Sequence, residues 1–488
     1  MTPTHEQLAI IDAAKNTTDN LLISALAGAA KTSTLIFVAE SLKSVPTLCL
    51  AFNKKIAEEM KERLPGNCEA MTLNSLGHRA WGSALGKRLI LDTSKTYNLL
   101  TAHIASFRGD DKSLAYERFN ELMQAVDFAK TRGWIPEGTF TYAKRLLTDD
   151  EYSAILPEEL SDFEFDLVRK IVGESIHQSL QGTIDFNDQI LMPTLFPNAS
   201  FTLFPLVLVD EAQDLSELNH KMLQKLAKKR IIAVGDACQA IYAFRGASTS
   251  SMKDLKDRFQ MKEFTLSISF RCPIAVVKAA QWRAPHMRWP EWAKEGTVRT
   301  LTSWNVHDLP DNAAIICRNN APLFRQALAL LKARRYPQLI GNDIGKNLLK
   351  IMKKFGSSSM PKAEVIENIV KWKMAKLAKT RSPGSIHDQA DCMLLFAEEG
   401  DNLGDALAYA EHIFNARGPI QLMTGHKSKG LEFDHVFILD EHLIGDSQQE
   451  DNLRYVMQTR AKQTLTYVDS EGWSDGMVPS HGEQAISN

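Results

Sequence analysis

The sequence predicts an α/β protein with two parallel-sheet domains, each carrying a short helical insertion. Apolar runs of strand length recur in two blocks of the chain, from residue 21 to 234 and from residue 313 to 439. Several runs end in acidic or small polar residues, as buried parallel strands do at the carboxyl edge of a sheet. Two mainly helical stretches, residues 88–182 and 342–415, interrupt the blocks. A chain of 488 residues is also too long for one hydrophobic core.

The composition is that of an ordinary globular protein, with 44% hydrophobic and 24% charged residues. The net charge is −2, so a nucleic-acid binder of this composition would concentrate its positive charge in a groove. The six cysteines lack the paired spacing of metal sites or disulfides, which predicts free thiols in a reducing compartment. No apolar signal region or membrane-length run is found. We therefore expect a cytoplasmic protein without a membrane partner. A bacterial or phage origin is a separate expectation.

A strand followed by a turn of small residues opens the first block. A helix is expected over residues 4–14, a strand over residues 21–25, and a second helix from about residue 33. The turn has the layout of a phosphate-binding loop, in which backbone N–H groups and the helix dipole attract phosphate. Lys31 would reach the terminal phosphates of ATP, and the Thr32 hydroxyl would bind Mg²⁺. The nucleotide-binding residues expected here are Ala27, Gly28, Ala29, Ala30, Lys31, Thr32 and Ser33.

Two positions of this loop depart from the usual pattern. Leu26 and Ala30 stand where glycines are common. Alanine at position 30 is unfavourable only if the backbone needs a positive φ there or if its Cβ meets the phosphate.

The next two predicted strands lead to residues suited to nucleic acid. Strands are expected over residues 47–51 and 70–73, with a helix over residues 56–64. Aromatic, amide and hydroxyl groups at such strand ends would stack on bases and contact phosphates. Without this context Phe52 would be interpreted as a core residue. The residues concerned are Phe52, Asn53, Thr72 and Asn74.

The stretch 206–246 carries the acidic residues expected to act on ATP. A buried strand over residues 206–209 ends in Asp210 and Glu211, and a second strand over residues 231–234 follows a helix. Asp210 would hold Mg²⁺, and Glu211 would orient or deprotonate an attacking water. A solvated turn is the alternative for an Asp-Glu pair taken alone. The turn after residue 239 adds two aromatics and an arginine, namely Tyr242, Phe244 and Arg245.

A second α/β unit is expected from about residue 269. Its strands are predicted over residues 313–317, 338–340 and 436–439, after a strand of the first unit over residues 264–270. Arg460 falls on a predicted helix of this unit, and an arginine from a second domain neutralises transition-state charge in many NTPases. The basic stretch 371–381 is interpreted as a solvated helix face, with a DNA contact as the alternative. His426 has no neighbours at ligand spacing, so no metal is assigned to it.

These motifs together resemble the UvrD/Rep-type superfamily 1 DNA helicases, nearly over the whole chain and in the same order. Three runs are especially specific: residues 235–247, residues 426–433 and residues 455–462. Residues 51–54 are also similar to the branch that includes the F-box-containing eukaryotic helicases.

The resemblance implies two RecA-like P-loop NTPase domains with ATP in the cleft between them. The first domain would comprise residues 1–87 and 183–268, with the insertion 88–182. The second would comprise residues 269–341 and 416–488, with the insertion 342–415.

Roles for single residues follow from the same resemblance. Gln7 would recognise adenine and Phe270 would stack on it, while Gln239 would sense the γ-phosphate. Arg271 and Arg460 would be arginine fingers. Together with Lys31, Asp210, Glu211 and Gln239 they form the expected catalytic set. The remaining implied contacts are Gly430 and Glu432 to the nucleotide, and Thr424 and His426 to DNA.

The expected function is an ATP-dependent single-stranded DNA translocase and helicase with 3′ to 5′ polarity, which uses Mg²⁺. It would act on single strands and on single/double-strand junctions, and the short insertions point to a protein partner or self-association that supports unwinding. One alternative is a DNA-binding subunit with a decayed phosphate loop. Another is a motor that strips proteins from DNA with little unwinding of its own.

Overall fold

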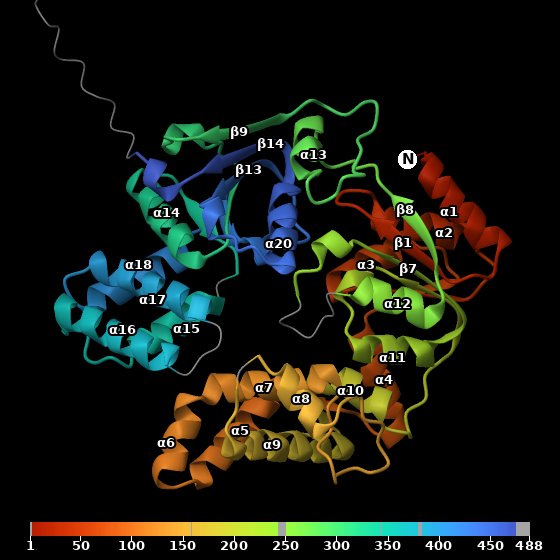
Figure 1. The fold of residues 1–488 in the computed structure, drawn as a ribbon, viewed down its shortest axis with the longest axis horizontal. Helices are drawn as coiled ribbons and strands as arrows, with labels where there is room; N and C mark the ends of the chain where they lie inside the picture. Colours follow the sequence, from red (N-terminus) through yellow and green to blue (C-terminus); the bar gives the residue numbers. More distant parts are fainter. Residues whose placement is uncertain (1, 158, 243–249, 342, 379–382, 475–488) are drawn as a thin grey trace, which may run out of the picture. The chain divides into compact units, whose positions relative to one another are not determined.

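The computed structural model describes residues 2–157, 159–242, 250–341, 343–378 and 383–474. The chain divides into two compact units, Met1–Ser267 and Ile268–Asn488. Each unit contains a six-stranded sheet in which all neighbouring strands are parallel (Figure 1). The predicted α/β class with two parallel sheets is therefore confirmed.

The sheet of the first unit has the strand order β3-β2-β6-β7-β1-β8. Alternate residues of a strand point to opposite faces, and both faces are covered here. Leu206 and Leu208 of β6 join the apolar cluster beneath α1, α2 and α3. Val207 and Val209 join the larger cluster on the other face. The strands are β1 Leu21–Ala25, β2 Thr47–Leu50, β3 Cys68–Met71, β6 Phe204–Val209, β7 Ala227–Gly235 and β8 Lys262–Leu266.

The helices of this unit begin at residues suited to capping. Thr4 and Ser216, for example, form capping boxes at the starts of α1 and α11. The helices are α1 His5–Asn16, α2 Lys31–Ser41, α3 Lys54–Arg63, α4 Leu73–Leu85, α10 Asp188–Leu195, α11 Glu217–Leu226 and α12 Ser251–Phe259, with the 3-10 turns η1 Ala212–Asp214 and η2 Ala237–Gln239.

A helical insertion packs against α10 and α11, the helices on the second face of this sheet. Its Trp134, Tyr152 and Ile171 belong to the same apolar cluster as the sheet residues. The two-stranded parallel ladder β4–β5, which closes the insertion, was not expected. The elements are β4 Ile90–Leu91, α5 Lys95–Ser106, α6 Gly109–Glu117, α7 Phe119–Arg132, α8 Asp149–Ile155, α9 Asp162–Gln181 and β5 Thr183–Ile184.

The second unit repeats the plan with the order β11-β12-β10-β13-β14-β9. Its strands are β9 Thr297–Leu301, β10 Ala313–Cys317, β11 Pro337–Leu339, β12 Ile420–Thr424, β13 Phe433–Leu439 and β14 Ala461–Val468. Its helices are α13 Ile274–Ala280, α14 Asn320–Lys332, α15 Asp343–Met352, α16 Lys362–Leu377, α17 Pro383–Glu398, α18 Leu403–Asn415, α19 Gly425–Ser428 and α20 Gln448–Gln458, with the 3-10 turns η4 Val306–Asp308, η5 Glu441–Leu443 and η6 Ser470–Gly472.

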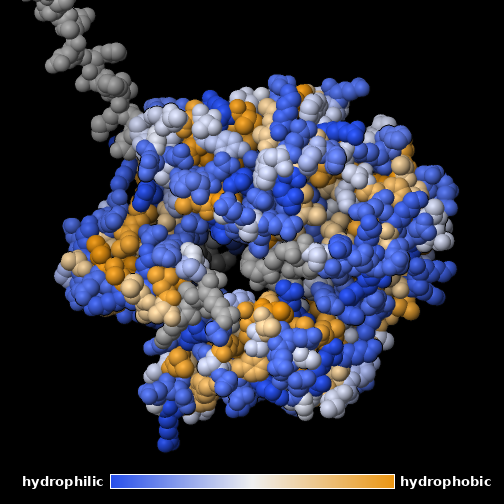
Figure 2. All heavy atoms as spheres, viewed as in Figure 1, coloured by the Kyte–Doolittle hydropathy of each residue, from blue (hydrophilic) through white to orange (hydrophobic). Residues whose placement is uncertain are grey.

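The helices α15 to α18 occupy the stretch predicted as the second insertion. They share one apolar core with the sheet strands, from Ile315 of β10 to Phe396 of α17. Val370 and Met374 of α16 are exposed, and Figure 2 shows apolar residues gathered over this helical region. Part of the basic stretch 371–381 lies outside the described residues.

Several expected boundaries are wrong. The strand expected over residues 70–73 is β3 Cys68–Met71, and Leu73 already belongs to α4. The helix after the phosphate loop begins at Lys31 rather than near residue 33. Strand β8 ends at Leu266 rather than at residue 270, because the Ser267 backbone N–H and hydroxyl bind the Glu6 carboxylate instead of continuing the ladder. Arg460 lies in the turn between α20 and β14 rather than on a helix.

The six cysteines are free thiols, and four of them are buried. Among the described residues, no helix is long and apolar enough to cross a membrane.

Candidate nucleotide and nucleic-acid site

The phosphate loop joins β1 to the first turn of α2. Gly28 has φ 74° and Ala30 has φ 57°, both in the left-handed region. Ala30 is the residue before α2 and gives it no side-chain cap. The first N–H groups of a helix have no partner within the helix, so this turn is suited to bind an anion. The loop therefore has the conformation of a phosphate cradle, although alanine occupies a position that favours glycine.

The loop contacts the acidic end of β6 through two side-chain pairs. Thr32 Oγ1 donates to Asp210 Oδ2 at 2.7 Å, and Lys31 Nζ lies 3.1 Å from Glu211 Oε2. Strands β6, β7 and β1 are neighbours in the sheet, so their carboxyl ends bring these residues together. The solvated-turn alternative for the Asp-Glu pair is wrong, because Asp210 is 4% exposed.

Burial and mutual charge set the electrostatics of this cluster. Burial alone would lower the pKa of Lys31, but the carboxylates of Glu211, Asp236 and Asp210 outweigh it and raise that pKa above its usual value. Burial, followed by the charge of Glu211, raises the pKa of Asp210 to about 6. Burial also raises the pKa of Asp236. The site thus concentrates negative charge in a poorly solvated place, where an added cation would be favourable.

The residues at the end of β7 complete the cluster. Gln239 Nε2 donates to Asp236 Oδ2 at 2.6 Å. Gln213 links the two strand ends, because its Nε2 donates to Glu211 Oε2 at 2.5 Å and its Oε1 accepts from the Asp236 backbone N–H at 2.9 Å. Glu211 itself has φ 53°. Non-glycine residues in the left-handed conformation are often found at functional sites. The sequence assigns no role to Gln213 or Asp236, although both lie inside the stretch 206–246.

Mg²⁺ fits the donors present. It prefers oxygen ligands from carboxylates and hydroxyls, and the Thr32 hydroxyl and Asp210 carboxylate already lie within hydrogen-bond distance of each other. The raised pKa of Asp210 indicates a carboxylate whose charge lacks full compensation.

Gln7 lies beside the loop, but its side-chain amide is hydrogen-bonded to other residues of the protein. It is 1% exposed. Its Oε1 accepts from the Thr4 backbone N–H, and its Nε2 donates to Thr34 Oγ1 at 2.9 Å. Ser33, the last predicted loop residue, accepts a hydrogen bond from Arg63.

A cavity of about 510 Å³ in the first unit is lined by five of the predicted DNA-binding residues: Phe52, Asn53, Thr72, Asn74 and Tyr242. The rings of Phe52 and Tyr242 are nearly parallel, with centroids 6.2 Å apart and an interplanar angle of 6°. Phe52 is 47% exposed, so a core role for it is wrong. Phe244 and Arg245 lie outside the described residues.

The same cavity contains residues that the sequence did not single out. Phe186, Asn187 and Lys130 line it, and Phe186 is 54% exposed. Asn74 Nδ2 donates to the Phe186 backbone oxygen at 2.8 Å. The run around Phe186 was interpreted only as the return from the insertion, so its aromatic residue between two aspartates was the missed signal.

A buried ion network fixes the loop that carries Phe186. Lys95 Nζ lies 2.7 Å from Asp188, and Lys130 Nζ lies 2.5 Å from Asp185 and 2.9 Å from Asp188. The side chains of Lys95, Lys130 and Asp188 are fully buried. Buried pairs of this kind hold their elements in one geometry, so the network joins the insertion to the loop that lines the cavity.

The second unit holds the other predicted nucleotide contacts. Arg271 Nε lies 2.7 Å from Glu432 Oε2. Phe270 stacks on Trp292 with ring centroids 6.2 Å apart. Gly430 adopts φ 85°, a conformation that favours glycine.

Arg460 is held inside its own unit. It is 1% exposed, and its guanidinium donates to the backbone oxygens of Val456 and Leu431 at 2.8 and 3.1 Å. Contact with a nucleotide would require this side chain to leave those carbonyls.

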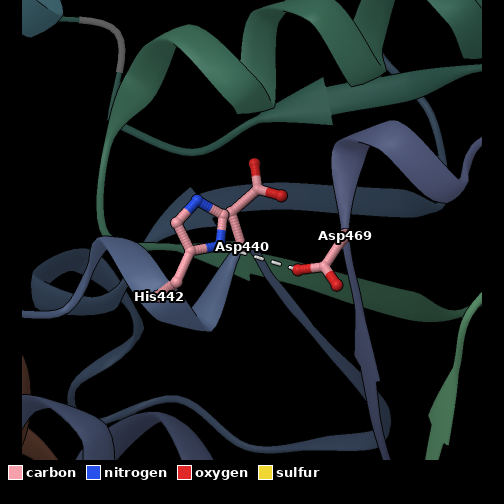
Figure 3. Close-up of side chains that lie close together, drawn as sticks. All are labelled: Asp440, His442 and Asp469. Atoms are coloured by element: carbon pink, nitrogen blue, oxygen red, sulfur yellow. Dashed lines mark ion pairs between the residues drawn. The ribbon is translucent and has the colours of Figure 1, made fainter.

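Thr424 is the residue before α19, and His426 lies within that short helix. Elsewhere in the second unit, the ligand atoms of Asp440, His442 and Asp469 lie within 4.8 Å of one another (Figure 3). Both Asp440 oxygens accept hydrogen bonds from Ser470, one from its backbone N–H and one from its hydroxyl. These hydrogen bonds and the ion pair between His442 and Asp469 join the segment after β13 to the segment after β14. We therefore interpret this group as structural and assign it no metal.

The fold and the loop geometry define a P-loop protein with two RecA-like parallel sheets. The UvrD/REP helicase N-terminal domain model matches residues 5–260, and the UvrD-like helicase C-terminal domain model matches residues 419–468. The chain belongs to the UvrD/Rep helicase family.

Curated relatives agree with this family. The chain is 26% identical to F-box DNA helicase protein 1 of Schizosaccharomyces pombe, over 96% of this chain and 57% of the relative. It is 25% identical to F-box DNA helicase 1 of Gallus gallus, over 96% of this chain and 49% of the relative. It is 25% identical to ATP-dependent DNA helicase PcrA of Leuconostoc citreum, over 63% of this chain and 43% of the relative. The chain thus spans about half the length of these relatives.

Proposed function

We propose that this protein is an ATP-dependent DNA helicase that translocates along single-stranded DNA with 3′ to 5′ polarity. The observation that carries the proposal is the contact of the phosphate loop with the acidic strand end, Lys31 with Glu211 and Thr32 with Asp210. A loop that binds phosphate beside a carboxylate that positions water is the arrangement that phosphoryl transfer needs. The family and the named helicases among its relatives support the same activity.

In the proposed reaction, Lys31 and the first turn of α2 bind the β- and γ-phosphates of ATP. Thr32 and Asp210 would hold Mg²⁺, which when bound neutralises phosphate charge. Glu211 accepts a proton from the attacking water. When phosphate replaces the Glu211 carboxylate as the partner of Lys31, that carboxylate becomes free for this role. Gln213 holds the Glu211 carboxylate in place.

The remaining assignments belong to the same proposal. Gln239 senses the γ-phosphate, Gln7 and Phe270 bind adenine, and Glu432 contacts the ribose. Arg271 and Arg460 stabilise transition-state charge. Thr424 and His426 contact DNA from the second unit.

Single-stranded DNA would occupy the cavity of the first unit. Its bases would stack on Phe52, Tyr242 and Phe186, which is how proteins bind single strands with little sequence preference. Asn53, Thr72 and Asn74 would contact the backbone. Changes of nucleotide state would then be coupled to movement along the strand. Junction binding and a protein partner for unwinding are part of this proposal.

ATP hydrolysis with and without single-stranded DNA tests the proposal, with Glu211→Gln as the matched variant. We expect stimulation by DNA in the wild type, loss of turnover in the variant, and ATP binding retained in both. Turnover that is unchanged in Glu211→Gln would reject the assignment. Absence of nucleotide binding in the wild type would favour the DNA-binding subunit with a decayed loop.

A strand-displacement assay beside a protein-displacement assay distinguishes the remaining alternative. Robust unwinding by the protein alone would count against a motor whose task is only to strip proteins from DNA.

A further inference from the structure

A second cavity of the first unit, about 550 Å³ in volume, lies far from the loop and acidic residues described above. It is formed by the insertion, by the segment between α10 and β6, and by the last turn of α11. Strand β6 begins at Phe204 and β7 at Ala227, so this cavity lies at the amino edge of the sheet. We call it the amino-edge cavity. Lys31 and Asp210 lie at the opposite, carboxyl edge.

The α11 helix separates this cavity from the one proposed for DNA. Ser216 and Asn219, at the start of α11, line the DNA cavity. Lys225, near its end, lines the amino-edge cavity. A helix of 10 residues is about 15 Å long, so one bound strand would not be expected to follow a single groove through both.

One side of the amino-edge cavity is apolar. Phe201 and Leu203 line it, and Leu203 is 53% exposed. Tyr142 is 54% exposed although its ring is held edge-on to Phe196, with centroids 5.8 Å apart. Large apolar side chains left exposed around a concave surface are typical of a binding site.

The other side carries two ammonium groups, those of Lys144 and Lys225. Burial, followed by the charge of Lys144, lowers the pKa of Lys225. Within the part of the chain that the structure describes, neither lysine forms an ion pair with a carboxylate. Lys225 donates one N–H to the Pro193 oxygen at 2.9 Å, and an ammonium has three such donors. An anion bound here would relieve the repulsion between the two cations.

We propose that the amino-edge cavity binds an acidic segment of a partner protein. Its carboxylates would pair with Lys144 and Lys225, and an aromatic or aliphatic side chain would pack against Phe201 and Leu203. The charge complementarity requires an anion, and the apolar wall distinguishes an acidic peptide from a phosphate backbone, which offers no side chain to fill it. The site would tether the protein to a partner without occupying the DNA cavity.

Fluorescence anisotropy with the full chain tests this proposal. The probe is a fluorescein-labelled decapeptide in which aspartates flank one phenylalanine and one leucine. The control peptide has asparagines in place of the aspartates, so it differs only in charge. We expect the acidic peptide to bind at least tenfold more tightly than the control peptide.

Two sets of variants assign that binding to the cavity. Lys144→Glu combined with Lys225→Glu should weaken the acidic peptide at least tenfold, and Leu203→Ser should weaken both peptides. Lys228→Glu makes the same charge change at an exposed lysine outside the cavity and should leave binding unchanged. Lys144→Glu alone changes an exposed side chain and tests the charge contribution if the double variant is unstable.

Three results would overturn the proposal. One is peptide binding that does not depend on charge, seen either as equal binding of the two peptides or as equal binding by the wild type and the lysine variants. Another is loss of duplex DNA affinity in the lysine variants with peptide binding intact, which would assign the cavity to DNA. The third is a concentration-dependent dimer that the lysine variants abolish, which would assign it to a second copy. DNA-stimulated ATP hydrolysis should stay unchanged in the lysine variants, so failure here is separable from failure of the proposed function.

Discussion

The backbone conformation of Ala30 lowers the stability of the phosphate loop. Its φ of 57° and ψ of 44° put it in the left-handed region, where an L-residue other than glycine is less stable by about 1–2 kcal/mol. The surrounding contacts hold this conformation, since Ala29 N–H donates to the Leu26 oxygen and Thr34 N–H to the Ala30 oxygen. The loop is therefore formed without its usual glycine, at a cost in stability.

Replacing Ala30 by glycine should stabilise the protein by up to about 1 kcal/mol, because glycine adopts a positive φ without a steric penalty. Urea unfolding of the wild type and Ala30→Gly measures the change. Ala29→Gly is the matched control, because Ala29 is buried with a negative φ and the same substitution should destabilise there. A loss of stability in Ala30→Gly would contradict the strained conformation.

Phe186 is an exposed aromatic residue of the cavity proposed for DNA, and the sequence alone assigns it no role. Phe186→Ala should weaken binding of a single-stranded oligonucleotide by about 5- to 150-fold, since stacking on an aromatic ring contributes about 1–3 kcal/mol per base. Phe52→Ala should have an effect of the same size. Fluorescence anisotropy at fixed salt measures both. Tyr116→Ala removes an equally exposed aromatic of the insertion that does not line the cavity, and affinity that falls equally in this variant would refute the assignment.

At the scale of elements, the sequence predicts strand bounds best where a short apolar run leads into a turn. The expected bounds of β1 and β10 agree with the structure to the residue. Each is a short apolar run that leads into a turn containing small or polar residues. Arg460 is expected on a helix because it follows an apolar run. Helix α20 instead ends at Gln458, and the Arg460 side chain donates to the Val456 oxygen in its last turn.

The assembly of the site depended on contacts far apart in sequence. Motif residues identified the loop, the acidic strand end and five of the residues that line the cavity proposed for DNA, because these residue types follow predicted strands. The ladder β4–β5 and the ion network of Lys95, Lys130 and Asp188 give no periodic signal. Such a network depends on three-dimensional packing of the insertion against α10, so composition and spacing could not predict it.

The contact between α11 and α12 predicts a pH dependence of stability. His220 is 1% exposed, and its ring nitrogen Nε2 lies 3.2 Å from Ser251 Oγ. Burial, followed by the charge of Arg258, lowers the pKa of His220 to about 4, against 6.5 in the unfolded chain. Because the folded state disfavours the charged form, this contribution is fully present above pH 6.5 and is lost as the pH falls towards 4.

The wild type should therefore lose about 2 kcal/mol of unfolding free energy between pH 7.5 and pH 5 through His220 alone. His220→Gln should lose correspondingly less over the same interval, even though it is less stable at pH 7.5. Urea titrations at the two pH values measure both differences. Parallel losses in the two proteins would show that His220 is not the titrating group.

At the scale of the whole molecule, two units of the same plan contribute different residues to one proposed reaction. The first unit carries the phosphate loop, the acids and the cavity lined by Phe52. The second carries Arg271, paired with Glu432, and the buried Arg460. The proposed function would therefore use charged groups of both units. The cytoplasmic location, the bacterial or phage origin and the assigned roles stay predictions.

Translocation along single-stranded DNA tests the central claim most directly. Stopped-flow fluorescence would follow arrival of the protein at a dye on one end of oligonucleotides of graded length, in the presence of ATP. We predict an arrival time that increases linearly with length when the dye is on the 5′ end, and no length dependence for Glu211→Gln. An arrival time independent of length in the wild type, despite ATP hydrolysis, would contradict a motor that moves along DNA.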